Sequence, residues 1–95
     1  MPRVDEPWDE RKARANLRKH GVSSEEAVTV DDDEQAWSEP DLEHSDLEPR
    51  FRVTGLSDLG RIITVACVYR RGKMRPISAW RATLRELNAY LYRHG

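Results

Sequence analysis

An almost uninterrupted apolar stretch within residues 61–70 constrains the fold of this chain more than any other feature. Apolar residues at successive positions indicate a strand that is buried on both faces and therefore central in a sheet. Residues 51–54 alternate apolar and polar, which predicts a half-buried strand before it, and residues 74–79 predict a third strand. Pro76 indicates either that this third strand lies at an edge or that it occupies a strand position whose N–H is not needed. The turns that separate the strands lie at 57–60 and 71–73. The sequence therefore predicts a small antiparallel β-meander.

Two helices are predicted before the strands. Asp9 can cap a helix over residues 10–20, and Gly21 provides the expected C-terminal end. A second helix over 24–30 starts at a capping box, in which Ser23 is followed three residues later by Glu26. Its expected buried residues are Ala27, Val28 and Val30. Four successive acids then end this helix, and at most a short strand is expected around residues 36–37.

A third helix is predicted after the strands. Thr83 and Glu86 form a second capping box, and the helix extends to about residue 93. Its apolar face consists of Leu84, Leu87 and Leu91. Together the elements predict one α+β domain over residues 1–95, with helices on one face of the sheet and loose termini at 1–5 and 94–95.

The charges of the chain are strongly segregated, although 16 basic and 17 acidic residues nearly cancel. Residues 1–49 hold 6 bases and 15 acids, a net of −9, whereas residues 50–95 hold 10 bases and 2 acids, a net of +8. Residues 25–49 contain 11 acids and no base. A basic half of this kind is typical of nucleic-acid binding. The alternative is that the acidic segment pairs with the basic half within the molecule.

Several classes of function are excluded by the sequence. The single cysteine, Cys67, lies in the apolar strand, so we expect a buried, reduced thiol and no disulfide framework. No apolar run is long enough for a membrane span, and the first residues lack a secretory signal, which indicates a cytoplasmic protein. The sequence also lacks a glycine-rich phosphate loop, a zinc-protease motif and a calcium loop. We therefore expect neither a metal nor another cofactor.

Motifs along nearly the whole chain, from about residue 6 to 92, resemble the BrnT family of bacterial toxins. These motifs share their order and spacing with the family. The matching residues are Trp8, Asp9, Glu10, Lys12, Ala13, Asn16, Leu17, Lys19, His20, Gly21, Val22, Ser23, Glu25, Glu26, Ala27, Pro40, Asp41, His44, Ser45, Arg50, Phe51, Gly55, Leu56, Ser57, Gly60, Arg61, Arg75, Ile77, Ser78, Ala79, Arg81, Ala82, Thr83, Glu86 and Tyr90.

The resemblance implies a RelE-like ribonuclease fold and the toxic half of a type II toxin–antitoxin pair. It implies a DNA-binding antitoxin partner, usually BrnA, that neutralises the toxin. It also implies metal-independent cleavage of RNA and inhibition of translation. Cleavage of this type needs an acid–base group and positive charge on the phosphate, for which arginine is well suited.

We assign the candidate site residues on this hypothesis. The phosphate clamp comprises Arg61, Arg75, Arg81 and Arg85. Ser78 hydrogen-bonds the phosphate or ribose, and Tyr90 or His44 acts as the acid–base group or stacks on a base. Further RNA contacts are assigned to Lys12, Arg50, Arg52 and Trp80.

Two positions depart from the family pattern. Trp80 stands where the family usually has an arginine, and Glu6-Pro7 replaces the usual aromatic residue before Trp8. Trp80 supports an alternative function, a module that binds antitoxin or RNA without cleavage. A third hypothesis is a protein-interaction domain whose acidic segment covers its own basic face, which predicts internal ion pairs.

Overall fold

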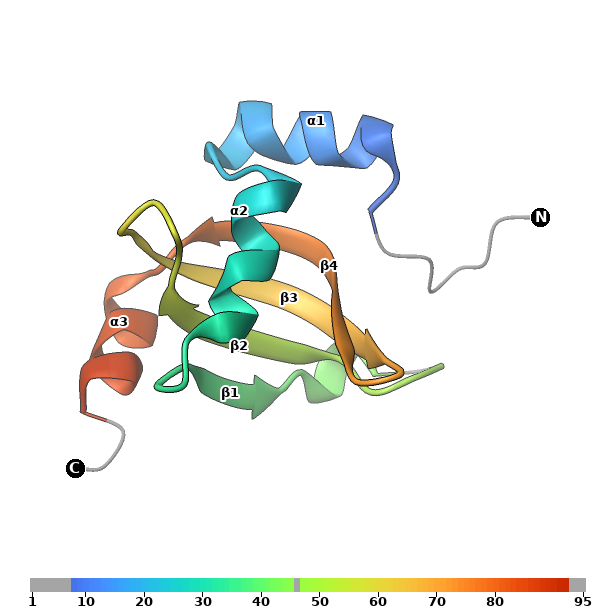
Figure 1. The fold of residues 1–95 in the computed structure, drawn as a ribbon. Helices are drawn as coiled ribbons and strands as arrows, with labels where there is room; N and C mark the ends of the chain where they lie inside the picture. The colour runs from blue at the N-terminus through green and yellow to red at the C-terminus, as the bar shows by residue number, and fades with distance from the viewer. Residues whose placement is uncertain (1–7, 46, 93–95) are drawn as a thin grey trace.

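Four antiparallel strands form a single sheet in the order β1-β2-β3-β4. The computed structural model describes residues 8–45 and 47–92, so the predicted loose termini at 1–5 and 94–95 lie outside the described residues. The strands are β1 (Trp37–Pro40), β2 (Phe51–Leu56), β3 (Ile62–Arg70) and β4 (Lys73–Arg81). The α+β class and the predicted meander β2-β3-β4 are confirmed, with β3 central and β4 at an edge (Figure 1). The meander gains β1 as a fourth strand, which extends the short strand expected around residues 36–37.

Pro76 is compatible with the edge strand because its backbone nitrogen faces away from β3, where no N–H is needed for strand pairing. The carbonyl of Pro76 points away from β3 and accepts a hydrogen bond of 3.1 Å from the backbone N–H of Trp8. The nitrogen and carbonyl of one strand residue point to the same side, so the nitrogen of Pro76 also faces away from β3. A register irregularity at Ala66 and Cys67 accompanies this position.

Three helices accompany the sheet: α1 (Glu10–His20), α2 (Ser24–Thr29) and α3 (Leu84–Leu91). Asp9 caps α1, Gly21 ends it in the left-handed conformation, and the capping box of Thr83 and Glu86 starts α3, all as predicted. Two 3₁₀ segments, η1 (Val30–Asp32) and η2 (Leu42–His44), add elements that the prediction did not contain. In the described part of the chain no helix combines the length and apolarity of a membrane span.

The core lies between α2 and one face of the sheet, which we call the core face (Figure 1). The side chains of Ile63, Val65 and Cys67 on β3 are fully buried there, as are Ala27 of α2 and Val30 of η1. Burial raises the pKa of the Cys67 thiol to about 12, which keeps it protonated, as the apolar stretch predicted. Val28, in contrast, is exposed, so its predicted burial was wrong.

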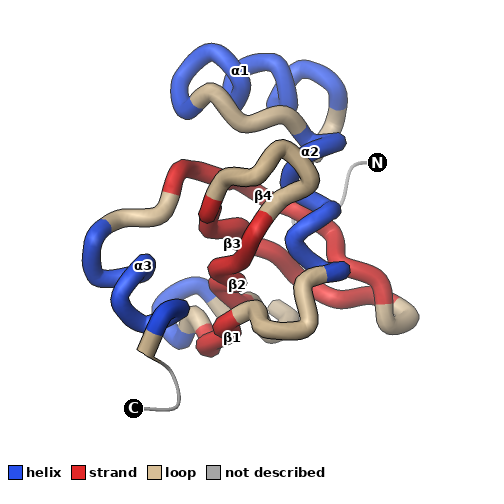
Figure 2. The backbone as a smooth tube through the Cα atoms, turned by 60° about the vertical axis from the view of Figure 1, so that its left-hand side comes forward, coloured by secondary structure: helices blue, strands red, loops and turns tan. Residues whose placement is uncertain are grey.

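The other face of the sheet, which we call the polar face, carries Arg52, Thr54, Thr64, Ser78 and Trp80 in neighbouring strands. Helix α3 packs at one end of this face, where Glu86 hydrogen-bonds Thr64. The helices therefore do not all lie on one face, and Figure 2 shows α3 well apart from α1 and α2. Leu84 and Leu91 are 73% and 55% exposed, whereas Leu87 is partly buried, and the polar side chains of Glu86 and Tyr90 also attach α3 to the rest of the domain.

Gly55 allows α2 and its following turn to approach β2. A Cβ at this position would lie 2.9 Å from Val30 Cγ1 and 3.1 Å from Ala36 Cβ. We expect Gly55→Ala to lower the free energy of unfolding by about 2 kcal/mol, because a packed core resists added volume. Urea unfolding checks this, with Gly55→Ala/Val30→Ala as the relieved double variant. A single variant as stable as the parent would contradict the close packing.

Candidate functional site

Glu39 of β1 is the centre of one polar cluster on the polar face. Its carboxylate accepts hydrogen bonds of 3.0 Å from the Trp37 indole and 3.0 Å from the Arg52 guanidinium. The guanidinium of Arg85, from α3, lies 3.7 Å away. The indole hydrogen bond and then Arg52 lower the pKa of Glu39, which stays ionised. Two arginines from separate elements therefore share one carboxylate, and Arg85 is the more exposed of the two.

Asp41 extends this cluster toward His44. The Nδ1 atom of His44 lies 3.0 Å from a carboxylate oxygen of Asp41, and Arg52 lies 3.7 Å from the other oxygen. The hydrogen bond with Glu39, followed by the charge of Asp41, raises the pKa of Arg52 further. The Nε of Arg52 is nevertheless buried without a hydrogen-bond partner among the described residues. This donor is available to an acceptor from a ligand if the side chain shifts.

A second cluster is centred on Glu86 at the start of α3. One of its oxygens accepts hydrogen bonds from the Thr64 hydroxyl at 2.9 Å, the Trp80 indole at 3.0 Å and the Thr83 backbone at 2.9 Å. Thr64 also pairs with Thr54 at 2.7 Å. The indole of Trp80 is thereby fixed on the polar face, and it links α3 to β4.

A groove of about 250 Å³ separates α1 from the edge strand β4. Its lining residues are Trp8, Lys12, Ala15, Asn16, Lys19, His20, Ile77 and Ser78. The members from α1 recur every three or four residues and so share one side of the helix. The groove continues to the polar face, because the rings of His20 and Trp80 lie 6.4 Å apart.

Asn16 holds the two walls of this groove together. Its amide nitrogen donates 3.0 Å hydrogen bonds to the carbonyls of Val22 and Ala79. Its oxygen accepts from the Ser78 hydroxyl at 3.0 Å and from the Ala79 backbone at 3.2 Å. The side chain is buried, so α1 is attached to β4 by a fully used amide.

Arg61 is committed to a buried carboxylate near the C-terminal end of α1. Its guanidinium forms a two-point ion pair with Glu26, whose side chain is 2% exposed, and also donates to the Gly21 carbonyl at 2.8 Å. The Arg61 hydrogen bond, assisted by Ser57, lowers the pKa of Glu26, and Arg81 adds a smaller effect. The capping box predicted for α2 is therefore only half formed: Ser23 caps the helix, whereas the carboxylate of Glu26 turns toward Arg61.

The ion pairs on the strands and on α3 connect the acidic and basic halves of the sequence. Acids from residues 25–49 pair with bases from residues 50–95 in each of these contacts. They are Glu26–Arg61, Glu39–Arg52, Asp41–Arg52, Glu48–Arg70 and Glu39–Arg85. Internal ion pairs are thus present, as predicted by the hypothesis that the acidic segment covers the basic half of the chain. They partly neutralise the arginines of residues 50–95.

The structure divides the predicted site residues into two sets. Those on or beside the polar face are Arg52, Ser78, Trp80, Arg85, His44 and Lys12. Arg75 stands opposite Val68 and so shares the polar face, but at the far end of β4, and Arg50 lies beside Ser45. Arg61 and Arg81 lie near Glu26, and Tyr90 contacts Asp33. Arg75 and Arg81 are about 20 Å apart at the usual rise of a strand. The four proposed clamp arginines are therefore not gathered around one point.

Three potential metal ligands lie close together in η2 and before it. Ligand atoms of Asp41, Glu43 and His44 lie within 4.8 Å of one another. Arg52 already places a positive charge 3.7 Å from Asp41, which competes with a cation for the same carboxylate. We therefore assign no metal to this group.

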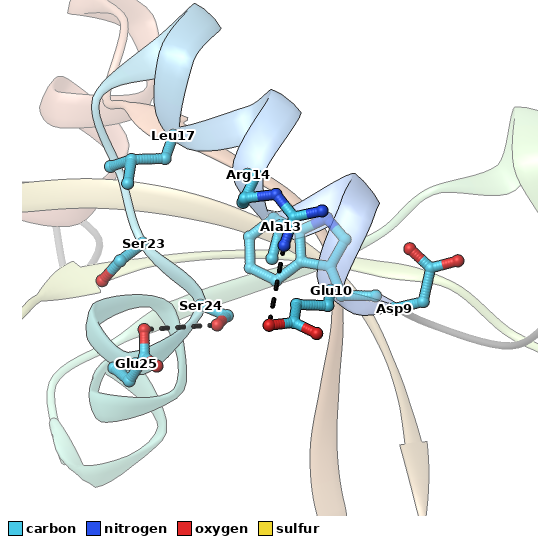
Figure 3. A pocket seen from close by; sticks show the side chains of 9 residues that line it. Asp9, Glu10, Ala13, Arg14, Leu17, Ser23, Ser24 and Glu25 are labelled. Atoms are coloured by element: carbon cyan, nitrogen blue, oxygen red, sulfur yellow. Dashed lines mark hydrogen bonds and ion pairs between the residues drawn. The ribbon is translucent and has the colours of Figure 1, made fainter.

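A larger hollow of about 320 Å³ lies between α1 and the start of α2 (Figure 3). Its charged residues are mainly acidic, and Figure 3 shows Arg14 directed toward Glu10, 3.6 Å away. The remaining acids are Asp9 and Glu25. This hollow is therefore a poor site for a phosphate, unlike the groove between α1 and β4.

The sequence predicted no site role for His20, Asn16, Glu39 or Glu86. One signal was present for the first two, because Lys12, Asn16, Lys19 and His20 repeat with helical spacing on one side of α1. The roles of Glu39 and Glu86 depend on strand register and on the position of α3, which no local pattern specifies.

The fold and site define a small α+β protein with a polar sheet face beside a basic groove. The chain matches, over residues 8–86, the family described as a ribonuclease toxin, BrnT, of type II toxin–antitoxin systems. It therefore belongs to the BrnT family, as the sequence motifs indicated. None of the curated proteins compared with the chain matches it. Membership in a type II toxin family implies an antitoxin partner.

Proposed function

We propose that this chain is a metal-independent endoribonuclease with a RelE-like fold that cleaves RNA in the cytoplasm and inhibits translation. A BrnA-like, DNA-binding antitoxin neutralises it. The family match supports this proposal. The structural observation that supports it best is that one face of the sheet and the groove beside it combine arginine, lysine, serine, histidine and tryptophan side chains. Such a set binds phosphates and stacks on bases without a metal ion.

The residues of the polar face have distinct roles in the proposed reaction. Arg85 binds a phosphate, since its side chain is 69% exposed and its contact with Glu39 is long. Arg52 adds positive charge to the same face, although Glu39 and Asp41 partly neutralise it. Ser78 donates to the ribose or phosphate, and Trp80 stacks on a base.

The remaining arginines take more distant roles. Arg75 and Arg81 are exposed and lie toward opposite ends of β4, so each binds a different phosphate along one RNA strand. Arg50 extends this track beyond β2. Arg61 acts as a positioning residue through Glu26, and Tyr90 positions α3 through its 2.7 Å hydrogen bond with Asp33.

The test is cleavage of RNA by the purified chain in the presence of EDTA. We expect cleavage that the cognate antitoxin abolishes, and growth arrest when the chain is produced alone. Arg85→Ala, which leaves the core untouched, is expected to reduce the cleavage rate about 100-fold. Absence of cleavage and of growth arrest would contradict the proposed function.

The alternative function, an inactive binding module, can be tested by the substitution Trp80→Arg. In Trp80→Arg the new guanidinium lies beside Glu86, so it can replace the indole hydrogen bond and keep α3 attached. We expect its cleavage rate to stay within about threefold of the parent, since Arg52 and Arg85 already supply the positive charge and the new guanidinium can stack on the base in place of the indole. A rise of about 100-fold from a negligible rate would instead favour the inactive module. Trp80→Phe, which lacks the indole donor, is the control for lost anchoring.

A further inference from the structure

The groove between α1 and β4 differs from the polar face in its charges. Its lining residues include two lysines and a histidine but no aspartate or glutamate. The arginines of the polar face, in contrast, contact Glu39 and Asp41. No ion pair joins Lys12 or Lys19 to a described carboxylate. Among the described residues, a phosphate entering the groove therefore displaces no ion-pair partner of these lysines.

We propose that this groove binds the phosphodiester of a single-stranded RNA at the cleavage point, and that His20 is the group that transfers the proton. The inference rests on the proposed function and assigns its reaction to a defined place. Lys12 and Lys19 lie two turns apart on one side of α1 and bind phosphates along the groove. Trp80, 6.4 Å from His20 between ring centres, stacks on the adjacent base.

His20 is suited to proton transfer because an imidazole ring has one nitrogen that can accept a proton and one that can donate a proton. It ends α1 at the mouth of the groove, with Ser78 of β4 lining the same space. The charged groups around it are Lys19 on α1, Arg61 at the Gly21 carbonyl, and Glu86 behind the Trp80 indole. His44, the earlier candidate, is instead held by Asp41 outside the groove.

The proposed step balances without a further reactant. The ribose 2′-oxygen attacks the adjacent phosphorus, so the bond between them forms while the bond from phosphorus to the 5′-oxygen breaks. The imidazole of His20 accepts the proton of the 2′-hydroxyl and returns a proton to the departing 5′-oxygen. The products are a 2′,3′-cyclic phosphate and a 5′-hydroxyl. Lysine charges stabilise the phosphorane in between.

Binding by the groove can be tested apart from cleavage. The probe is a fluorescent 2′-O-methyl RNA of mixed sequence, which lacks the nucleophile. We expect Lys12→Ala and Lys19→Ala each to reduce the slope of log affinity against log salt by about 0.7, the value for one phosphate contact on a single strand. Lys73→Ala, at the exposed start of β4, is the matched lysine control and leaves the slope unchanged. Equal effects of all three variants would overturn the groove as the binding site.

Cleavage of the unmodified RNA tests the histidine. We expect His20→Ala to reduce the single-turnover rate by about 100-fold or more, with affinity for the 2′-O-methyl probe nearly unchanged. Added imidazole should restore part of the cleavage that His20→Ala loses, because it supplies the missing acid–base group. Unchanged circular dichroism confirms the fold, and His20→Gln serves as a second variant of closer size.

The outcomes separate this inference from the proposed function. Cleavage that survives in His20→Ala but is lost in His44→Ala would overturn the role of His20 and leave the ribonuclease function in place. A parent chain that binds RNA through both lysines without cutting it would contradict the ribonuclease function and the proton transfer. The groove would then stand as an RNA-binding site alone.

Discussion

Replacement of Arg61 by alanine is expected to lower the free energy of unfolding by about 3 kcal/mol. The substitution leaves the carboxylate of Glu26, 2% exposed, without its two-point partner. It also removes the donor to the Gly21 carbonyl, at the turn between α1 and α2. Only the Ser57 hydroxyl remains to hydrogen-bond this carboxylate among the contacts found in the structure. A buried charge that loses its partner is among the most destabilising changes in a small domain.

Urea unfolding measures this effect, with Arg75→Ala as the matched control. Arg75 is exposed on β4, so its removal is expected to change stability by less than about 0.5 kcal/mol. The double variant Arg61→Ala/Glu26→Gln should recover part of the loss, because the unpaired charge is removed. Equal stability of Arg61→Ala and Arg75→Ala would contradict a structural role for the ion pair.

The same pair makes stability depend on pH in the acidic range. The pKa of Glu26 lies below its usual value of 4.5, mainly because of the hydrogen bond from Arg61. A carboxyl group with a lowered pKa in the folded state stabilises the protein above the usual pKa, and this contribution is lost as the pH falls through the lowered value. We expect the parent to lose stability below about pH 4.5 more steeply than Arg61→Ala. Parallel curves would show that the ion pair contributes little.

Local patterns predicted the strands and the helix ends. The alternation at 51–54, the apolar residues of β3 and the glycine after α1 each depend on a few neighbours in sequence, and each is found in the structure. Pro76 also predicted an edge strand, since the missing N–H has a local cause. The family motifs predicted the BrnT family, which the match over residues 8–86 confirms.

Contacts between residues far apart in the sequence determine the features that local patterns did not predict. Glu26 has the spacing of a capping residue, yet Arg61, 35 positions later, takes its carboxylate. The leucines of α3 have the spacing of a buried face, but the contacts of Glu86 and Tyr90 turn Leu84 and Leu91 toward solvent. The register of the strands likewise brings together acidic and basic residues from separate halves of the chain.

The candidate site shows the same division. The motifs predicted serine and arginine site residues, and Trp80 was noted as a departure from them, but the register alone places Arg52, Ser78 and Trp80 on one face. The groove was not predicted because its two walls, α1 and β4, are more than 50 residues apart in sequence. Asn16, with its four hydrogen bonds, is the residue that joins them.

Replacement of Asn16 by alanine is therefore expected to affect both stability and function. The substitution leaves the buried carbonyls of Val22 and Ala79 and the Ala79 N–H without this partner, which we expect to cost about 3 kcal/mol. Because the contact between α1 and β4 loosens, the groove loses its shape, and RNA cleavage should fall more than the folded fraction does.

Asn88→Ala is the matched control, since Asn88 is exposed on α3 and undergoes the same chemical change. We expect it to change stability by less than about 0.5 kcal/mol and to leave cleavage intact. Thermal unfolding followed by circular dichroism gives the stability, and single-turnover cleavage at a temperature where both variants are folded gives the activity. If folded Asn16→Ala cuts RNA as fast as Asn88→Ala, the attachment of α1 to β4 is irrelevant to the reaction, and the active centre must lie away from the groove.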